Sequence, residues 1–194
     1  AENENKKILL PSIAVNHLNG EICPAGVHYD NKKFSFTSTN KIEKINCLST
    51  RGIFLRFIDF LNSGGFYPKL LPHYFSDYEF TFRMIKNNSE VCINNSVVLK
   101  AYFEYSGTRV ISENVSILNY MRYFFSKKNI SNPLYVAMFI FLTTTFPFNF
   151  INSTKAAKNI MKGFVVSLIK TALNNLKLVK KRLYIFFSIF FLKK

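Results

Sequence analysis

Hydrophobic and polar residues alternate in short strand-like and helix-like runs through the N-terminal half of the chain. Runs of β-branched and aromatic residues bounded by turn residues predict strands over residues 8–17 and 91–105. Helices are predicted over residues 56–62 and 76–86, and the polar stretch 30–44 predicts a surface loop. Short strands that alternate with helices indicate an α/β fold for this half.

The C-terminal half has a different pattern. A short apolar helix is predicted over residues 115–125. Over residues 155–177 apolar residues recur every three or four positions with five lysines between them, which predicts an amphipathic helix with a basic polar face. Residues 134–151 carry no charge over 18 positions, close to the shortest length that crosses a bilayer. One transmembrane span at 134–151 is therefore an open alternative to a helix on the membrane surface.

The charged residues divide the chain at nearly the same place. The first 113 residues contain 13 basic and 11 acidic side chains, whereas residues 114–194 contain 13 basic side chains and no acidic one. The formal net charge is +15, and most of it lies in this acid-free, Phe- and Lys-rich part. Such one-sided charge indicates a polyanionic partner, either nucleic acid or the anionic leaflet of a membrane.

Composition excludes several other classes of protein. With 48% hydrophobic and 19% charged residues the chain is not intrinsically disordered, and seven Gly and six Pro are too few for a collagen-like chain. The three cysteines, Cys23, Cys47 and Cys92, are widely spaced and odd in number. They argue against a disulfide scaffold or a zinc ribbon and favour a reducing compartment.

Candidate chemistry is concentrated in residues 71–83, which read LPHYFSDYEFTFR. Ser76 and Glu79 have the spacing of a capping box, which would place Asp77 and Glu79 in the first turn of a helix. Backbone N–H groups and the helix dipole would keep a carboxylate ionised there, and such a carboxylate can deprotonate an acceptor hydroxyl. Two interpretations remain open for these acids, a catalytic base or residues that only cap the helix.

Three stretches of the chain, taken together, resemble a known enzyme family. They are STRG at residues 49–52, GGFYPKLLPHYFSDYEFTFR at residues 64–83 and YSGT at residues 105–108. Over roughly residues 8–110 the chain is similar to the C-terminal half of family 2 glycosyltransferases, and in particular to bacterial rhamnosyltransferase-like enzymes. The resemblance implies an α/β fold of the GT-A type.

The resemblance also implies a reaction and the residues that carry it out. Asp77 would be the base in an inverting transfer of sugar from a nucleotide-sugar donor to a glycan or lipid-linked acceptor in cell-surface polysaccharide synthesis. Arg51 and Gly52 would form a loop facing the sugar phosphate, where a guanidinium can pair with a phosphate oxygen, although a solvated Arg51 is the alternative. Glu79 would line the same site or cap the helix. His73 would contact substrate, help hold a divalent ion or serve only the structure.

The chain departs from the family pattern on the donor side. The Gly-Arg-Gly loop of the family reads Thr50-Arg51-Gly52 here. The family's N-terminal half, with its nucleotide-binding strands and Asp-x-Asp metal motif, would precede Ala1, and none of the three aspartates lies within two residues of another. A divalent cation, Mg or Mn, is implied by the family as a cofactor, but its ligands are not found in this sequence. We therefore expect acceptor-side and base-side elements in this sequence but no donor site.

Together these patterns predict two regions with different tasks. Residues 1–112 would form the acceptor and base half of the glycosyltransferase domain, and residues 113–194 a basic, amphipathic, membrane-associating helical region. Because basic helices gain about 1 kcal/mol per Lys or Arg near anionic lipid, residues 115–194 predict a peripheral protein on the cytoplasmic face of the cell membrane.

Two other functions are alternatives to this one. The chain could be a non-catalytic membrane-bound remnant or a subunit that needs a partner for nucleotide binding. A nucleic-acid-binding basic protein is less favoured, because the basic residues are interleaved with long Phe, Ile and Leu runs and no DNA- or RNA-binding signature occurs. We therefore expect no nucleic-acid partner.

Overall fold

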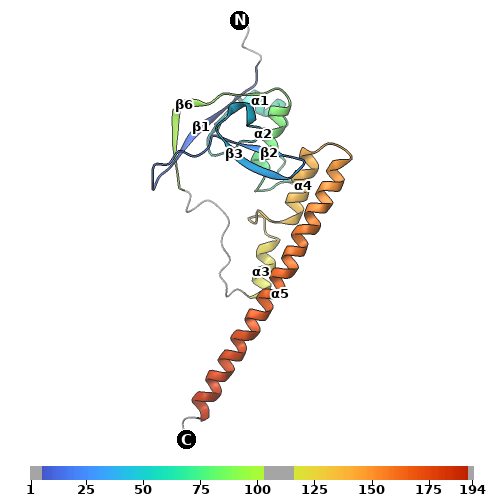
Figure 1. Ribbon diagram of the computed structural model, residues 1–194. Coiled ribbons are helices and arrows are strands. Elements are labelled where there is room, and N and C mark those ends of the chain that lie inside the picture. The colour runs from blue at the N-terminus through green and yellow to red at the C-terminus, as the bar shows by residue number, and fades with distance from the viewer. Residues whose placement is uncertain (1–5, 103–115, 192–194) are drawn as a thin grey trace.

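The computed structural model describes residues 6–102 and 116–191, and the chain has a mixed α/β structure (Figure 1). The strands gather in one body near the N-terminus, and a long helix, α5 (Phe148–Phe191), runs past this body and away from it (Figure 1). The α/β class predicted from the sequence is confirmed. The YSGT stretch at residues 105–108 lies outside the described residues.

A mixed sheet is built around the first strand, β1 (Ile8–Asn16). β1 pairs antiparallel with β4 (Ile53–Phe54), and it pairs parallel with both β5 (Glu90–Val91) and β6 (Asn94–Ala101). The strand predicted over 91–105 is thus two short strands as far as residue 102. Because β1 has neighbours on both sides, it occupies the middle of the sheet, as its apolar sequence ILLPSIAV favours.

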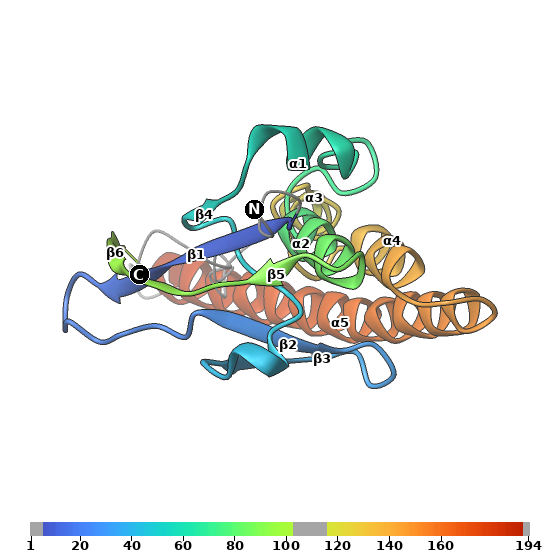
Figure 2. The same cartoon turned by 90° about the horizontal axis from the view of Figure 1, so that it is seen from above.

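A separate hairpin is formed by β2 (Gly26–Asp30) and β3 (Ser35–Thr39). In Figure 2 it is drawn in the lower part of the picture, beneath β1 and β5. It corrects the prediction of a surface loop over 30–44, which also contains a short 3-10 helix, η1 (Ile42–Lys44). The Ser and Thr residues of β3 gave the stretch its polar composition. Phe36 nevertheless stacks on Tyr29 with ring centroids 4.9 Å apart, so one face of the hairpin is apolar.

The short helices predicted from the sequence are confirmed as α1 (Phe57–Asn62), α2 (Ser76–Lys86) and α3 (Ile117–Phe124). The capping box predicted for α2 is wrong. The residue that precedes the helix is Phe75, no side chain caps its N-terminus, and the Ser76 hydroxyl donates instead to the His73 carbonyl at 3.0 Å.

The uncharged stretch 134–151 is divided between two helices. The first is α4 (Pro133–Thr143), which begins after Asn132, whose side-chain oxygen accepts the Leu134 N–H at 3.0 Å. The second is α5, which begins just after Pro147 and contains the predicted amphipathic stretch 155–177. The single helix needed for a span at 134–151 is therefore not formed. Within residues 6–102 and 116–191, no helix has both the length and the apolar character to cross a bilayer.

Two hydrophobic clusters hold the body together, and α2 contributes to both. One cluster joins α2 to β1 and to the segment before β4, with Leu9, Leu48 and Phe80 at its centre. The other joins the hairpin and the start of α2 to α4, with Tyr29 and Phe139 almost fully buried. Because α2 is covered on two sides, its first turn is held in a fixed place between the clusters.

Helix α4 is part of this core, although it follows the predicted division at residues 112 and 113. Its side chains Val136, Phe139 and Ile140 are buried in the cluster that contains Tyr29. The Tyr29 hydroxyl lies 3.2 Å from Thr143 Oγ1, which itself donates to the Phe139 carbonyl at 2.7 Å. The residues after 113 therefore do not pack as one uniform tail.

Candidate functional site

The candidate site lies at the first turn of α2, where Asp77 meets a loop from earlier in the chain. The Thr50 N–H donates to Asp77 Oδ2 at 3.2 Å, and the Tyr78 N–H donates to Oδ1 at 2.9 Å. The helix is entered through Phe75, which has a positive φ of 67° although it is not a glycine. Such a backbone conformation costs free energy and survives only where packing holds it, here through the burial of the Phe75 ring.

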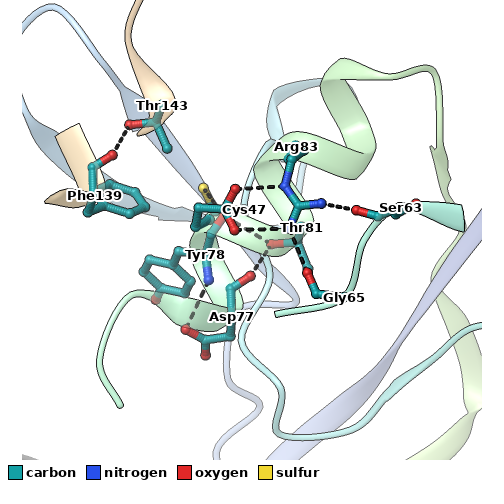
Figure 3. Close-up of polar contacts among 10 residues, drawn as sticks. Cys47, Ser63, Gly65, Asp77, Tyr78, Thr81, Arg83, Phe139 and Thr143 are labelled. Carbon is teal, nitrogen blue, oxygen red and sulfur yellow. Dashed lines mark hydrogen bonds and ion pairs between the residues drawn. The ribbon is translucent and has the colours of Figure 1, made fainter. Parts of the chain in front are cut away.

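The loop that carries Thr50 is attached to α2 by further contacts. The buried Thr81 hydroxyl accepts the Leu48 N–H at 2.9 Å and lies 2.8 Å from the Asp77 carbonyl, to which it donates. One residue earlier, the thiol of Cys47 donates to the Tyr78 carbonyl at 3.7 Å. Figure 3 shows Asp77, Tyr78, Thr81 and Cys47 grouped around this turn. The loop and the helix therefore position the carboxylate together.

Burial dominates the electrostatics of the site. It raises the pKa of Asp77 above its ordinary value, although the N–H groups of Thr50 and Tyr78 and the nearby charge of Arg51 act in the opposite direction. Burial also raises the pKa of Cys47 and of Tyr78, and the charge of Asp77 adds to both shifts. The N–H groups at the start of the helix were expected to have the larger effect on the pKa of Asp77, but desolvation outweighs them and the pKa is raised.

Arg51 and Gly52 follow Thr50 in the same loop. The Arg51 side chain is exposed and close enough to Asp77 for its charge to lower the carboxyl pKa. Gly52 has φ of 122°, and a Cβ built there would lie 2.2 Å from Ser12 Oγ and 2.3 Å from Leu99 Cδ1. Its carbonyl accepts the Ser12 N–H at 2.8 Å. Gly52 thus anchors the loop to β1 by a close backbone approach.

Glu79 has a different role from the two that were predicted for it. Its side chain is only 3% exposed, and both of its oxygens accept from Arg83, at 2.7 Å from Nε and 3.1 Å from Nη2. Arg83 also donates to the Ser63 and Gly65 carbonyls, as Figure 3 shows. Glu79 therefore orients an arginine that ties the Gly-Gly turn, residues Gly64 and Gly65, to α2, and it does not cap the helix.

His73 lies in the loop before α2 with an exposed side chain. Its ring is near the Tyr74 ring, with centroids 4.6 Å apart, and its carbonyl accepts the Ser76 hydroxyl. The observed contacts of His73 thus support the turn that leads into Phe75. They assign no ligand to its imidazole.

A divalent cation does not fit the residues of this site. Among the described residues, no three His, Cys, Asp or Glu side chains come together in a group that could hold a metal ion. Both carboxylate oxygens of Asp77 accept backbone N–H groups. Both oxygens of the nearby Glu79 accept from Arg83.

The sequence did not identify all the residues that build the site. Thr50 contacts Asp77, and Thr81 contacts Leu48, across 27 and 33 positions of the sequence. Arg83 contacts Glu79 one helical turn away. The four-residue spacing of Glu79 and Arg83 was a usable signal, because oppositely charged side chains at that spacing meet on a helix. Nothing local indicates the partners of Thr50 or Thr81.

Comparison of the chain with protein-family models, with curated proteins and with solved structures finds no match. The class of the fold is mixed α/β.

Proposed function

We propose that this chain is the acceptor-side part of an inverting glycosyltransferase, with Asp77 as the catalytic base. The observation that carries the proposal is the hydrogen bond between the Thr50 N–H and the Asp77 carboxylate. It joins the two sequence stretches, 49–52 and 64–83, that resemble family 2 glycosyltransferases. If the two stretches form one active site, as the resemblance implies, they must lie next to each other in the structure. Their contact supports this arrangement.

The proposed reaction is a single displacement. A hydroxyl oxygen of the acceptor attacks the anomeric carbon of the donor sugar, and its proton passes to a carboxylate oxygen of Asp77. The bond between the anomeric carbon and the phosphate oxygen breaks, and a nucleoside diphosphate leaves with the electron pair. Each carboxylate oxygen accepts one N–H bond in the structure and keeps a further lone pair for the incoming proton.

The environment of Asp77 suits a general base. A base works best when its pKa is close to the pH at which it operates, and burial raises the pKa of Asp77 toward that range. The same raised pKa makes the carboxylate a stronger proton acceptor than an exposed aspartate. Arg51 is the neighbouring positive charge, and in this proposal it pairs with a phosphate oxygen of the donor.

We further propose that α5 holds this site against an anionic membrane. Five apolar residues on one side of α5 are between 48% and 65% exposed, and we call them the α5 apolar stripe: Val165, Ile169, Leu173, Leu176 and Val179. Lysines border the stripe on the same helix, including Lys170 and Lys177. Apolar side chains beside lysines match the acyl and headgroup layers of an anionic leaflet, which is the partner that this surface fits.

The test of the catalytic proposal starts from the coding DNA upstream of Ala1, which defines the polypeptide to be assayed. That protein is mixed with bacterial membranes and a set of nucleotide sugars, and the release of nucleoside diphosphate is measured. Asp77→Asn should reduce the rate by about 10²–10⁴-fold. The exposed Glu43→Gln is the matched control and should leave the rate unchanged.

Two outcomes would decide against the proposal. If Asp77→Asn retains the full rate, Asp77 is not the base. If the wild-type protein releases no nucleoside diphosphate with any sugar yet binds anionic vesicles, the non-catalytic membrane-bound alternative replaces the enzyme.

A further inference from the structure

A second feature of the molecule lies between the hairpin turn and the start of α5. It is a cavity of about 320 Å³, which is at the small end of the range for ligand pockets, about 300–1,000 Å³. Ten residues line it: Asn31, Lys32, Lys33, Phe34, Ile140, Asn152, Lys155, Ala156, Asn159 and Ile160. We call it the hairpin–α5 pocket.

The charged residues that line the hairpin–α5 pocket are all basic. They are Lys32 and Lys33 from the hairpin turn and Lys155 from α5. Asp30, the nearest acid along the chain, accepts the N–H groups of residues 32 and 33 with its Oδ1, and its charge interacts with that of Lys33. Three lysines against one nearby carboxylate leave an excess of positive charge beside the pocket, which favours an anion there.

The uncharged lining residues also suit an anion with a carbon skeleton attached. Three asparagines, whose side-chain amides can donate N–H groups, line the pocket together with four apolar residues, Phe34, Ile140, Ala156 and Ile160. Charge interactions are stronger beside apolar walls than in open water. A phosphate group bound at the lysines would leave the apolar walls for the organic part of an ester.

The hairpin turn is built to hold its lysines in place. Phe34 has a positive φ of 52°, and its ring packs edge-on against Tyr29 with centroids 6.2 Å apart. The two hydrogen bonds to Asp30, 2.9 Å from the Lys32 N–H and 3.2 Å from the Lys33 N–H, close the turn on its other side. The turn therefore has a set conformation before any ligand arrives.

We propose that the hairpin–α5 pocket is a binding site for a phosphate group, carried either by a small soluble ester or by a phospholipid headgroup. Lys32, Lys33 and Lys155 bind its charge, and Asn152 and Asn159 donate to its oxygens. The site is independent of the sugar transfer proposed above, since it shares no residue with the site around Asp77. It is also separate from the α5 apolar stripe.

The first experiment titrates the whole protein with inorganic phosphate and with glycerol 3-phosphate at constant ionic strength, with binding followed by calorimetry. Asn159→Asp, which places a negative charge at the exposed edge of the pocket, should weaken binding about tenfold. The control is Asn174→Asp, which makes the same charge change at an exposed position further along α5 and should leave binding unchanged. Lys155→Gln should weaken binding about fivefold.

The second experiment measures binding to vesicles of phosphatidylglycerol and of phosphatidylcholine. Saturable binding of the soluble phosphates that Asn159→Asp weakens and Asn174→Asp does not identifies a soluble ester. Preference for phosphatidylglycerol that Asn159→Asp alone weakens, without soluble phosphate binding, identifies a headgroup. Equal effects of Asn159→Asp and Asn174→Asp in both experiments, or no binding in either, overturn the proposal. Loss of sugar transfer in Asp77→Asn bears on neither result.

Discussion

Asp77 and Thr50 meet through a hydrogen bond of 3.2 Å from the Thr50 backbone N–H to the Asp77 carboxylate, across 27 positions of sequence. The bond exists because two separate anchors bring the loop to the helix. The Thr81 hydroxyl accepts the Leu48 N–H at one end of the loop. At the other end the Gly52 carbonyl accepts the N–H of Ser12 in β1. A carboxylate held in this way is partly withdrawn from water, which raises its pKa.

The raised pKa of Asp77 predicts a pH-dependent difference in stability between the wild type and Asp77→Asn. The unfolded carboxyl loses its proton near the ordinary value of 3.8, whereas the folded one keeps it to a higher pH. The folded state therefore binds more protons in this window, and the Asp77 contribution to stability falls as the pH rises through the folded pKa. Urea unfolding of both proteins from pH 4 to pH 7 should show that the wild type loses stability relative to Asp77→Asn as the pH rises. A constant difference would contradict the raised pKa.

The buried pair of Glu79 and Arg83 predicts a large loss of stability in Glu79→Gln. The variant leaves the arginine without a counter-charge at a largely buried position, and this should cost about 3 kcal/mol. The matched control is Glu90→Gln, which breaks the solvent-exposed pair of Glu90 with Lys6 and should cost much less than Glu79→Gln. Urea unfolding measures both. Equal costs would mean that Glu79 does not hold the Gly-Gly turn.

We predict that a side chain at Gly52 is excluded by steric collision as well as by backbone strain. Gly20, which has a positive φ but open space around it, allows the two effects to be separated. Gly52→Ala adds a Cβ that collides with Ser12 and Leu99 at a positive φ, and it should cost about 3 kcal/mol. Gly20→Ala has a positive φ of 70° with nothing within 4 Å of the new Cβ, so it should cost only about 1 kcal/mol. Thermal unfolding compares them. If Gly52→Ala is as stable as Gly20→Ala, the close approach to β1 is not required.

Helix α4 predicts that a substitution after residue 113 can destabilise the body of the protein. Phe139 is fully buried beside Tyr29, so Phe139→Ala should lower the free energy of unfolding by about 3–5 kcal/mol. Phe146, in the turn after α4, is 77% exposed, and Phe146→Ala should change it by no more than about 0.5 kcal/mol. A small effect of Phe139→Ala on unfolding would show that α4 is not part of the core.

The α5 apolar stripe predicts a specific loss of membrane binding. Leu173→Asp removes an apolar side chain from the proposed lipid contact and should weaken binding to phosphatidylglycerol vesicles at least about tenfold. Asn174→Asp changes the charge by the same amount at the next residue, outside the stripe, and should weaken binding much less. Vesicle co-sedimentation measures both. If Leu173→Asp binds vesicles as the wild type does while its mass in solution falls, the stripe joins two copies of this chain instead.

The sequence alone determined the local elements with strong patterns. The helix at 76–86, the first strand and the amphipathic stretch 155–177 follow from periodicity and stop signals, which act over a few residues. The same reasoning missed β3, because a hairpin strand that is half polar has the composition of a loop. It also allowed one helix over 134–151, where the structure has a turn between α4 and α5.

Only the tertiary structure decided which contacts the candidate site residues make. Asp77 and Glu79 are indistinguishable as first-turn acids in the sequence, yet one faces a loop N–H and the other is enclosed by an arginine. In the hairpin–α5 pocket, Lys155 lines the same cavity as Lys32 and Lys33, although it lies more than 120 positions after them in the chain. Burial and contact between distant segments set pKa values and pairings, and those depend on packing that no local pattern encodes.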